Sequence, residues 1–157
     1  VIFRPHNVYG PDMGWEHVIP QFILRMKNLS KTPQNPVKFP IQGTGKETRS
    51  FVYIDDFIDG LMIVLEKGEH LGIYHIGTME EISIENIARE VGRYFDKDVI
   101  IIPGKLMKGS TLRRCPDTTK LKKLGYKQKV PFKQGLKITA AWYDKNADKK
   151  QKLGIGE

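Results

Sequence analysis

The sequence predicts an α/β fold in which the late strands of an incomplete parallel sheet alternate with helices. Short apolar runs with strand character alternate along the chain with longer segments whose apolar residues recur at helical spacing. Only four or five short strands are visible, fewer than a parallel sheet covered on both faces normally contains. We therefore expect strand and helix layers, and we expect part of the sheet to lie outside these 157 residues.

The first half of the chain opens the alternation. The expected elements are a strand from residue 1 into the turn at Gly10-Pro11, a helix over 16–29, and strands over 37–41 and 48–54. The helix carries apolar residues at helical spacing, namely Val18, Ile19, Phe22, Ile23 and Met26. A segment with two prolines over 30–36 and a glycine turn over 42–45 separate these elements.

A second helix is expected directly after the strand over 48–54. Asp55 or Asp56 is placed to cap its start, and Gly68 is placed to end it. Its predicted buried face consists of Phe57, Ile58, Leu61, Met62 and Leu65.

The second half continues in the same way. We expect strands over 72–77 and 98–102 and helices over 83–95, 117–124 and 131–146. Ser83, Asp117 and Pro131 are suited to begin these three helices. The last helix has as packing candidates Phe132, Leu136, Ile138, Thr139 and Trp142. One unit over 1–144 is predicted, followed by a basic tail over 145–157 that we expect to be disordered.

Composition excludes several classes of protein. No apolar run approaches the roughly 18 residues of a membrane span, so no membrane partner is predicted. A single cysteine, Cys115, rules out an internal disulfide and fits a cytoplasmic location. One cysteine and four scattered histidines show no metal-ligand spacing, so no metal site is predicted. A net charge of +8 favours an anionic partner, although part of it lies in the tail.

Three segments carry polar side chains suited to an anion. The opening strand delivers Arg4, His6, Asn7 and Tyr9 to its carboxyl end, where ligands of open α/β sheets bind. Arg49 begins a strand and can present a planar fork to phosphate oxygens. Arg113 and Arg114 precede a short helix. Each segment also has a structural interpretation, because Asn7 can cap a turn and the arginines can form weak surface pairs or remain solvated.

No arrangement for nucleophilic or redox catalysis is present in the sequence. Cys115 has no histidine at a supporting spacing. The turn Gly43-Thr44-Gly45 has two of the three glycines of a dinucleotide fingerprint and precedes no helix. No tyrosine is followed four residues later by a lysine. We therefore predict no catalytic residue in this chain.

Five pieces of sequence resemble the extended short-chain dehydrogenase/reductase family, the NAD-dependent nucleotide-sugar epimerases and dehydratases. They are RPHNVYGP at 4–11, HVIP at 17–20, TRSFVYIDD at 48–56, IYHIG at 73–77, and RRCPDTTK at 113–120 with LGY at 124–126. Each piece alone is weak, whereas five in this order and spacing are specific. The resemblance covers residues 1–143 and implies the C-terminal, substrate-binding part of an extended Rossmann-type fold.

The resemblance implies roles for individual residues in binding a substrate. Asn7 would contact the diphosphate or the sugar. Val18 and the strand that ends at Ile41-Gln42 would line the base and ribose. Arg49 and one of the two neighbouring arginines at 113 and 114, with Arg114 preferred, would clamp the diphosphate.

The resemblance also implies NAD as the cofactor of the intact enzyme. The backbone at Pro5 and His6 would lie against the nicotinamide. The glycine-rich loop and the Tyr-Lys pair that such enzymes use belong to the half that is not present, so the chain alone is not expected to turn over substrate. One departure is His75, which stands where many relatives carry asparagine near the substrate.

The expected function is binding of the nucleoside-diphosphate part of a UDP-, dTDP- or GDP-linked sugar, by a fragment of an enzyme that is a homodimer when intact. Two alternatives stay open. The charge of +8 fits a basic nucleic-acid-binding module, although no reader motif is present and no nucleic-acid partner is predicted. The other alternative is a non-catalytic nucleotide-sugar sensor built on the same fold.

Overall fold

The computed structural model describes residues 1–106 and 108–149 and has the expected α/β class. The strands are β1 (Ile2–Pro5), β2 (Val8–Tyr9), β3 (Val37–Pro40), β4 (Thr48–Ser50), β5 (Val52–Tyr53), β6 (Ile73–Ile76), β7 (Glu81–Ser83), β8 (Val99–Ile102) and β9 (Arg113–Arg114). The helices are α1 (Val18–Ser30), α2 (Ile54–Lys67), α3 (Ile84–Tyr94), α4 (Thr119–Lys123) and α5 (Phe132–Asn146).

The strands are divided among four short sheets. β1 pairs with β6, β2 with β5, and β3 with β8, each in parallel. The fourth sheet has the order β7-β4-β9, in which β7 is antiparallel to β4 and β9 is parallel to it. The parallel pairs agree with the predicted class. The short strands β7 and β9 were not expected from the sequence.

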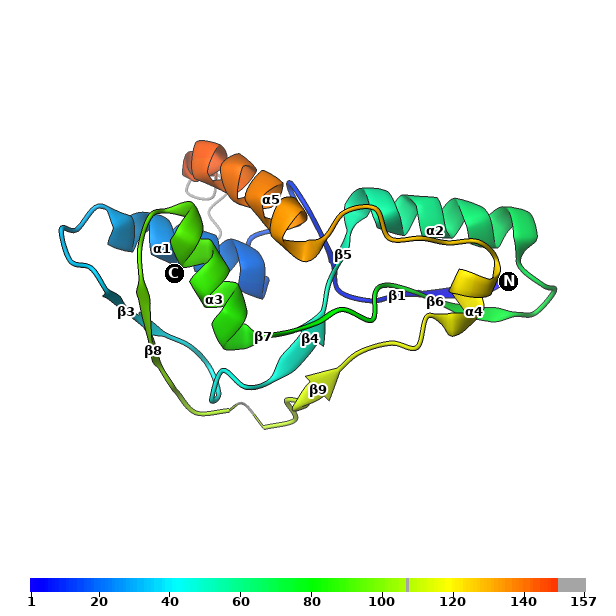
Figure 1. The fold of residues 1–157 in the computed structure, drawn as a ribbon, viewed down its shortest axis with the longest axis horizontal. Helices are drawn as coiled ribbons and strands as arrows, with labels where there is room; N and C mark the ends of the chain where they lie inside the picture. The colour runs from blue at the N-terminus through cyan, green and yellow to red at the C-terminus, as the bar shows by residue number, and fades with distance from the viewer. Residues whose placement is uncertain (107, 150–157) are drawn as a thin grey trace.

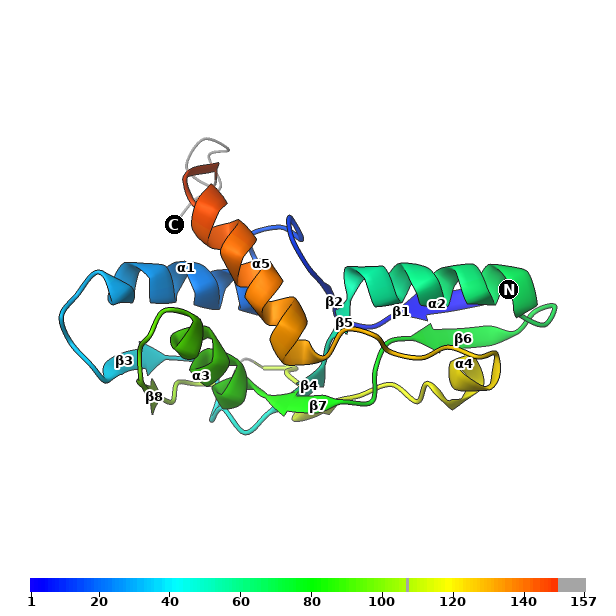
Figure 2. The same ribbon diagram turned by 45° about the horizontal axis from the view of Figure 1, so that its top comes forward.

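The molecule is elongated, with a different group of elements at each end. Figures 1 and 2 show α1, α3, α5, β3 and β8 at one end, and β1, β6, α2 and α4 at the other. The three-stranded sheet and the β2–β5 pair lie between them. These central strands therefore connect the two ends of the molecule.

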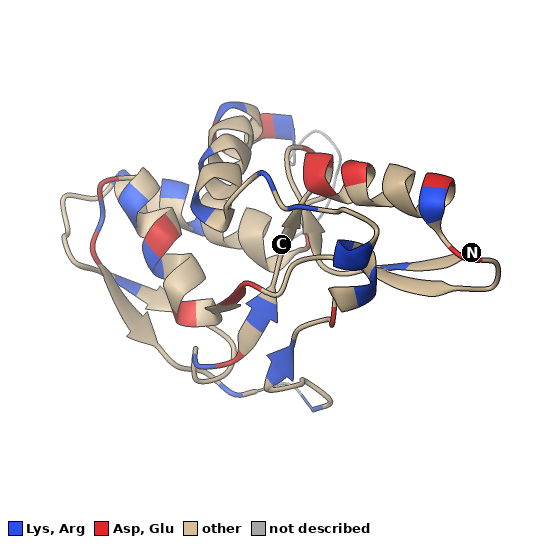
Figure 3. Ribbon diagram, turned by 45° about the vertical axis from the view of Figure 1, so that its right-hand side comes forward, with Lys and Arg blue, Asp and Glu red and all other residues tan. Residues whose placement is uncertain are grey.

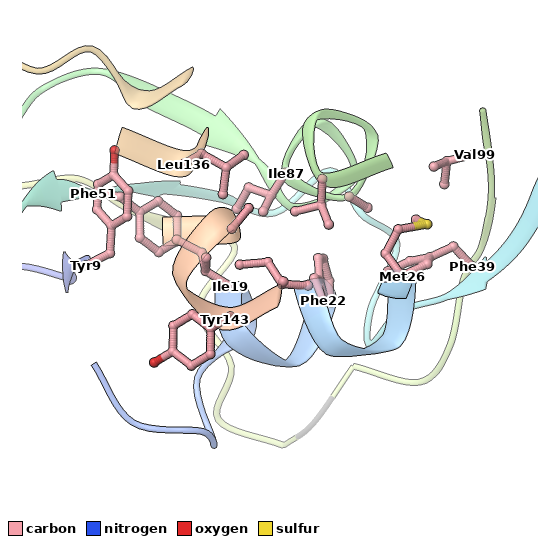
Figure 4. Close-up of a cluster of buried hydrophobic side chains, with 14 of the residues drawn as sticks. Tyr9, Ile19, Phe22, Met26, Phe39, Phe51, Ile87, Val99, Leu136 and Tyr143 are labelled. Atoms are coloured by element: carbon pink, nitrogen blue, oxygen red, sulfur yellow. The ribbon is translucent and has the colours of Figure 1, made fainter. Parts of the chain in front are cut away.

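The larger hydrophobic core is built around α1, α3 and α5 (Figure 4). The helical spacing predicted for α1 is confirmed, because Ile19, Phe22, Ile23 and Met26 are all buried. The ring of Phe22 meets that of Phe39 on β3 edge to face at 5.0 Å. These contacts fix α1 over β3. They thereby also fix the position of the polar side chains of α1, such as Gln21 and Arg25.

Helix α5 approaches β2 and β5 very closely. A Cβ atom on Gly135 would lie 2.3 Å from the hydroxyl of Tyr9, so only glycine fits at this position of the helix. The same hydroxyl donates to the carbonyl oxygen of Phe132 at 3.1 Å. Burial raises the pKa of Tyr9, which keeps this hydroxyl protonated as a donor.

A smaller core joins α2, β6 and α4. It consists of Val64, Tyr74, Ile76, Leu121 and Tyr126. Gly60 permits the close packing of α2 on β6, since a Cβ atom there would lie 2.8 Å from Ile76.

The single strand predicted over 48–54 is wrong. The segment contains β4, a break at Phe51, and β5, and α2 already begins at Ile54. β4 pairs with β7 and β9, whereas β5 pairs with β2, so the chain passes from one sheet to another at Phe51. Phe51 is buried at this passage, and the alternating pattern therefore continues across a change of sheet.

The predicted cap of α2 is also wrong. The residue before the helix is Tyr53, and no side chain caps the first turn. Asp56 is fully buried instead and accepts hydrogen bonds from the backbone N–H groups of Lys129 at 2.9 Å and Val130 at 3.0 Å. Asp56 therefore ties α2 to the loop that leads into α5. Gly68 ends the helix as predicted.

The predicted buried face of α2 is only partly correct. Ile58, Met62 and Leu65 are 48%, 49% and 59% exposed, whereas Gly60 and Val64 are buried. The two-stranded β1–β6 sheet covers one side of a helix that is apolar on more than one side.

Two of the predicted helix starts hold in the structure. Ser83 accepts a hydrogen bond from the Asn86 N–H at 3.3 Å, and Pro131 precedes α5. Of the packing candidates on α5, Ile138 is 43% exposed and does not pack. The predicted tail boundary at residue 145 falls in the last turn of α5, and the rest of the tail from residue 150 lies outside the described residues.

Candidate functional site

A cavity of about 520 Å³ opens between α1, the glycine turn after β3, and the strands β4 and β9. Five of the residues predicted to bind substrate line it, from five separate segments: Asn7, Val18, Gln42, Arg49 and Arg114. The structure therefore brings these five predicted residues together. Their part in binding remains a prediction.

The pairing of β4 with β9 explains why two arginines meet in the cavity. The parallel register places Thr48 beside Arg113 and Arg49 beside Arg114. Because successive side chains of a strand point to opposite faces, Arg49 and Arg114 share one face and Arg113 points to the other. Arg49 and Arg114 line the cavity and Arg113 does not.

Arg113 and Arg114 have different partners. Arg113 forms an ion pair with Glu81 of β7 at 2.6 Å, with further hydrogen bonds at 3.0 and 3.1 Å. Within residues 1–106 and 108–149, no ion pair of 4.0 Å or less involves Arg49 or Arg114. Arg49 donates instead to the carbonyl oxygens of Thr48 at 2.7 Å and Thr111 at 2.8 Å. These two bonds fix its guanidinium without neutralising it.

Arg49 and Arg114 are neighbouring cations in a cavity that Arg25, Glu16 and Glu47 also line. Burial and the charge of Arg114 lower the pKa of Arg49, and the opposite charge of Glu47 acts against them. Like charges opposite one another on adjacent strands destabilise a sheet. An anion between them would relieve the repulsion and accept charge-assisted hydrogen bonds from both forks.

Asn7 occupies the cavity wall in an unusual backbone conformation. Its φ of 40° lies in the left-handed region, which asparagine tolerates better than most residues. Its side-chain nitrogen donates to the Ser50 carbonyl oxygen at 2.8 Å, so β4 orients the amide. The side-chain oxygen and the second N–H of such an amide suit an oxygen-rich ligand.

Glu47 shapes the glycine turn and was not predicted as a site residue. Its carboxylate accepts from the N–H and hydroxyl of Thr44 at 3.0 and 3.1 Å and from the N–H of Gly45 at 2.8 Å. Burial alone would raise the pKa of Glu47, but these hydrogen bonds outweigh it and lower the pKa. The ionised side chain therefore holds the turn that carries Gln42, and it also faces the cavity.

The wall formed by α1 was largely missed by sequence reasoning. Beyond Val18, the helix contributes Gln21, Phe22 and Arg25, whose spacing of three and four residues marks one helix face. Arg25 lies over the ring of Phe39 at 5.2 Å and donates to the carbonyl oxygen of Pro40. The signal that could have identified this wall is the pair of polar residues Gln21 and Arg25, which are four residues apart and lie beside the apolar face of the helix.

Three predicted residues lie outside the cavity lining. Ile41 is buried beside Gln42, and Pro5 and His6 are at the carboxyl end of β1. The described residues contain no cluster of three or more metal-ligating side chains. No helix among them is long and apolar enough to cross a membrane.

Comparisons with known proteins show the family to which the chain belongs. The model of the NAD dependent epimerase/dehydratase family matches residues 1–77. The human dTDP-D-glucose 4,6-dehydratase is 34% identical over 155 residues, a match that covers 93% of this chain and 42% of that protein. This chain belongs to the NAD-dependent epimerase/dehydratase family. The resemblance to extended short-chain dehydrogenases/reductases is thereby confirmed.

Solved structures of NAD-dependent epimerases and dehydratases share the fold. The UDP-glucose 4-epimerase of Thermotoga maritima, solved with UDP-glucose, is 28% identical with a TM-score of 0.78. The match covers 92% of this chain and 46% of that one. DesIV, a dTDP-glucose 4,6-dehydratase from Streptomyces venezuelae with NAD and TYD bound, is 30% identical with a TM-score of 0.78, over 94% and 44% of the two chains. The chain thus spans less than half the length of these relatives.

The cofactor of this epimerase/dehydratase family is NAD, which is bound in several of the similar structures. The residues of this chain do not by themselves form a site that fits it. The sequence holds neither a complete glycine-rich fingerprint nor a Tyr-x-x-x-Lys pair. The two predicted contacts to NAD, Pro5 and His6, lie on β1 and just after it, outside the cavity. We therefore derive no redox step from these residues.

Proposed function

We propose that this chain forms the nucleotide-sugar-binding part of an NAD-dependent epimerase or dehydratase, corresponding to its C-terminal half. The observation that carries the proposal is the meeting of Arg49 and Arg114 side by side in one cavity, where neither forms an ion pair with a carboxylate of residues 1–106 or 108–149. A pair of neighbouring guanidinium groups suits a diphosphate, because each phosphate can accept hydrogen bonds from one of them.

The other walls of the cavity fit the remaining parts of such a ligand. Asn7 supplies an oriented amide for a sugar hydroxyl or a phosphate oxygen. The α1 wall around Val18 and Phe22, with Gln42 opposite, offers an apolar surface with polar ends that suits a nucleobase and its ribose. A volume of about 520 Å³ falls within the ordinary range for small-molecule sites.

The substrate class is supported by the names of relatives, which act on UDP-, dTDP- or GDP-linked sugars. Besides the two enzymes above, they include a trifunctional UDP-glucose 4,6-dehydratase of Arabidopsis thaliana and a probable GDP-L-fucose synthase of Oryza sativa, 34% and 31% identical. The chain's own residues would bind and orient the diphosphate, while groups outside these 157 residues would carry out hydride transfer. The intact enzyme would be a dimer in the cytoplasm.

The nucleic-acid alternative receives no support from these relatives. Figure 3 shows Lys and Arg distributed over helices, strands and loops, with Asp and Glu among them on several of these elements. Nucleic-acid-binding domains concentrate such charge on one face.

Binding measured by calorimetry tests the proposal. We expect UDP-glucose, dTDP-glucose or a GDP-hexose to bind the chain with a Kd between about 1 µM and 1 mM, and no turnover when NAD is added. Failure of all three ligands to bind, together with steeply salt-dependent binding to DNA, would contradict the proposal and favour the nucleic-acid module. Turnover by the purified chain would contradict the assignment of the redox groups to another part of the enzyme.

A further inference from the structure

Two histidines meet at the carboxyl ends of adjacent parallel strands. The Nε2 atom of His6, directly after β1, lies 2.6 Å from the Nδ1 atom of His75 on β6, with ring centroids 4.8 Å apart. The backbone N–H of His6 donates to Ile76 at 3.0 Å, which continues the β1–β6 pairing to this point. Both rings are half-buried. The predicted roles of the cavity residues do not account for this pair.

The pair is connected to two residues of the cavity. Asn7 follows His6 directly, and its left-handed backbone turns the chain from the pair into the cavity wall. On the other side, a Cβ atom on Gly77 would lie 3.0 Å from Pro116 and 3.1 Å from His6. Arg114 is only two residues before Pro116, so the segment that carries Arg114 passes close to the histidine pair.

Geometry limits the number of protons that the pair can hold. At 2.6 Å one facing nitrogen must carry a proton and the other must accept it. One additional proton makes one ring a cation that donates to the other, which is a charge-assisted bond. A second additional proton would place an N–H group on both facing nitrogens, so that neither could accept a hydrogen bond. The pair thus exists in a neutral and a singly charged form without losing its bond.

Burial and the neighbouring positive charges disfavour the charged form of His6. Burial lowers the pKa of His6 below 6.5, and His75, Arg114 and Arg4 lower it further. The carboxylate near the pair is Asp117, whose own pKa is lowered by hydrogen bonds to Thr119 and, less strongly, by the charge of His75. An anion held by Arg114 would offset part of the positive field at His6.

We propose that binding of a nucleoside diphosphate in the cavity is coupled to the uptake of one proton by the His6–His75 pair. This inference depends on the proposed function. The coupling is reciprocal, so protonation of the pair tightens binding by the same factor by which binding favours protonation. The pair would thereby add a positive charge near Arg114 when the ligand is bound.

The test is calorimetric titration with UDP-glucose, whose diphosphate diester stays ionised throughout, in two non-phosphate buffers of different ionisation enthalpy. We expect uptake of about 0.5–1 proton per ligand near pH 6.5, and binding tighter by about 3–10-fold at about pH 6 than at about pH 8. Both effects should vanish in the double variant in which His6→Asn is combined with His75→Asn.

Two other histidines are the controls. His17 lines the cavity, and His70 is exposed in the turn before β6. The proton uptake should persist in His17→Asn and in His70→Asn. Imidazole NMR of the free protein should show His6 titrating with a midpoint below 6.5 that rises when UDP-glucose binds.

The outcomes separate the two proposals. Binding without proton uptake, or uptake that survives in the His6→Asn, His75→Asn double variant or disappears in His17→Asn, overturns the coupling and leaves the proposed function standing. Absence of UDP-glucose binding at every pH overturns the coupling, and the parallel titrations with dTDP-glucose and a GDP-hexose then decide the proposed function. A backbone NMR spectrum like that of the unmodified protein establishes that each variant is folded.

Discussion

Arg49 and Arg114 lie opposite one another on β4 and β9, where their like charges oppose the pairing of the two strands. Natural sheets normally avoid such pairs or neutralise them. Arg113, the residue before Arg114, is neutralised in this way by its ion pair with Glu81. The cost in stability is explained if the pair is kept for a ligand. Removing either arginine should therefore weaken binding without a matching loss of stability.

Arg49→Ala and Arg114→Ala should each weaken UDP-glucose binding by about 10–100-fold, because each removes a charge-assisted bond of about 1.5–3 kcal/mol. Neither should lower the melting temperature appreciably. Arg113→Ala is the matched control, since it removes a neighbouring guanidinium that does not line the cavity. Calorimetry on the three variants checks this, and equal losses in all three would contradict it.

Glu47→Gln should lower the melting temperature at neutral pH, since an amide cannot accept all the N–H donors of the turn. The pKa of Glu47 is lowered in the folded state, so its contribution to stability is present above about pH 4.5 and lost as the pH falls through the folded value. The difference from the unmodified protein should therefore shrink as the pH falls below about 4.5. Glu69→Gln, at an exposed turn, should show no such pH-dependent difference in thermal denaturation.

The sequence was sufficient for some of these residues and not for others. Asn7, Arg49 and Arg114 were selected because their residue types, order and spacing match a family pattern. Whether Arg113 or Arg114 faces the cavity is decided by the strand register. That register depends on the pairing of β9 with a strand more than 60 residues earlier in the sequence. Glu47 carries no local signal, because its partners belong to a turn whose conformation it stabilises itself.

At the scale of elements, α2 shows where local patterns fail. Its length and its end at Gly68 follow from its apolar residues and glycine. Its orientation does not, because the faces of α2 that are buried depend on the sheet and loop packed against it. The buried carboxylate of Asp56 reflects a contact with the chain more than 70 residues later, which no local cap rule can predict.

Asp56→Ala should lower the free energy of unfolding by about 2–5 kcal/mol, because it leaves two backbone N–H groups of the 129–130 loop without an acceptor. The exposed neighbour Asp55 occupies the same first turn and has the same charge. Asp55→Ala should cost less than about 1 kcal/mol. Chemical denaturation of both variants makes the comparison, and similar losses would show that the helix dipole and not the loop contact is responsible.

At the scale of the whole molecule, the end formed by β1, β6 and α2 is unusually apolar. Its exposed side chains include Ile2, Phe3, Ile58, Met62, Leu65 and Ile73, each at least 39% exposed. Two-stranded parallel sheets with free edges tend to pair with other strands. The alternating elements predicted this sheet, but the extent of its exposed surface emerges only from the assembled fold.

The isolated chain should therefore associate with itself in a concentration-dependent way through this end. Met62→Lys with Leu65→Lys should shift it towards monomer in light scattering, because both substitutions place charge on the exposed face of α2. Ile138→Lys, which charges an exposed position on α5 at the other end, should not. A monomer of high thermal stability in the unmodified chain would contradict this prediction.

A crystal structure of the chain with UDP-glucose tests the central claim most directly. The diphosphate should lie between the guanidinium groups of Arg49 and Arg114, within about 3 Å of both, with Asn7 on the same side. A diphosphate bound at another face of the molecule, with the cavity between α1 and β4 left vacant, would contradict the account.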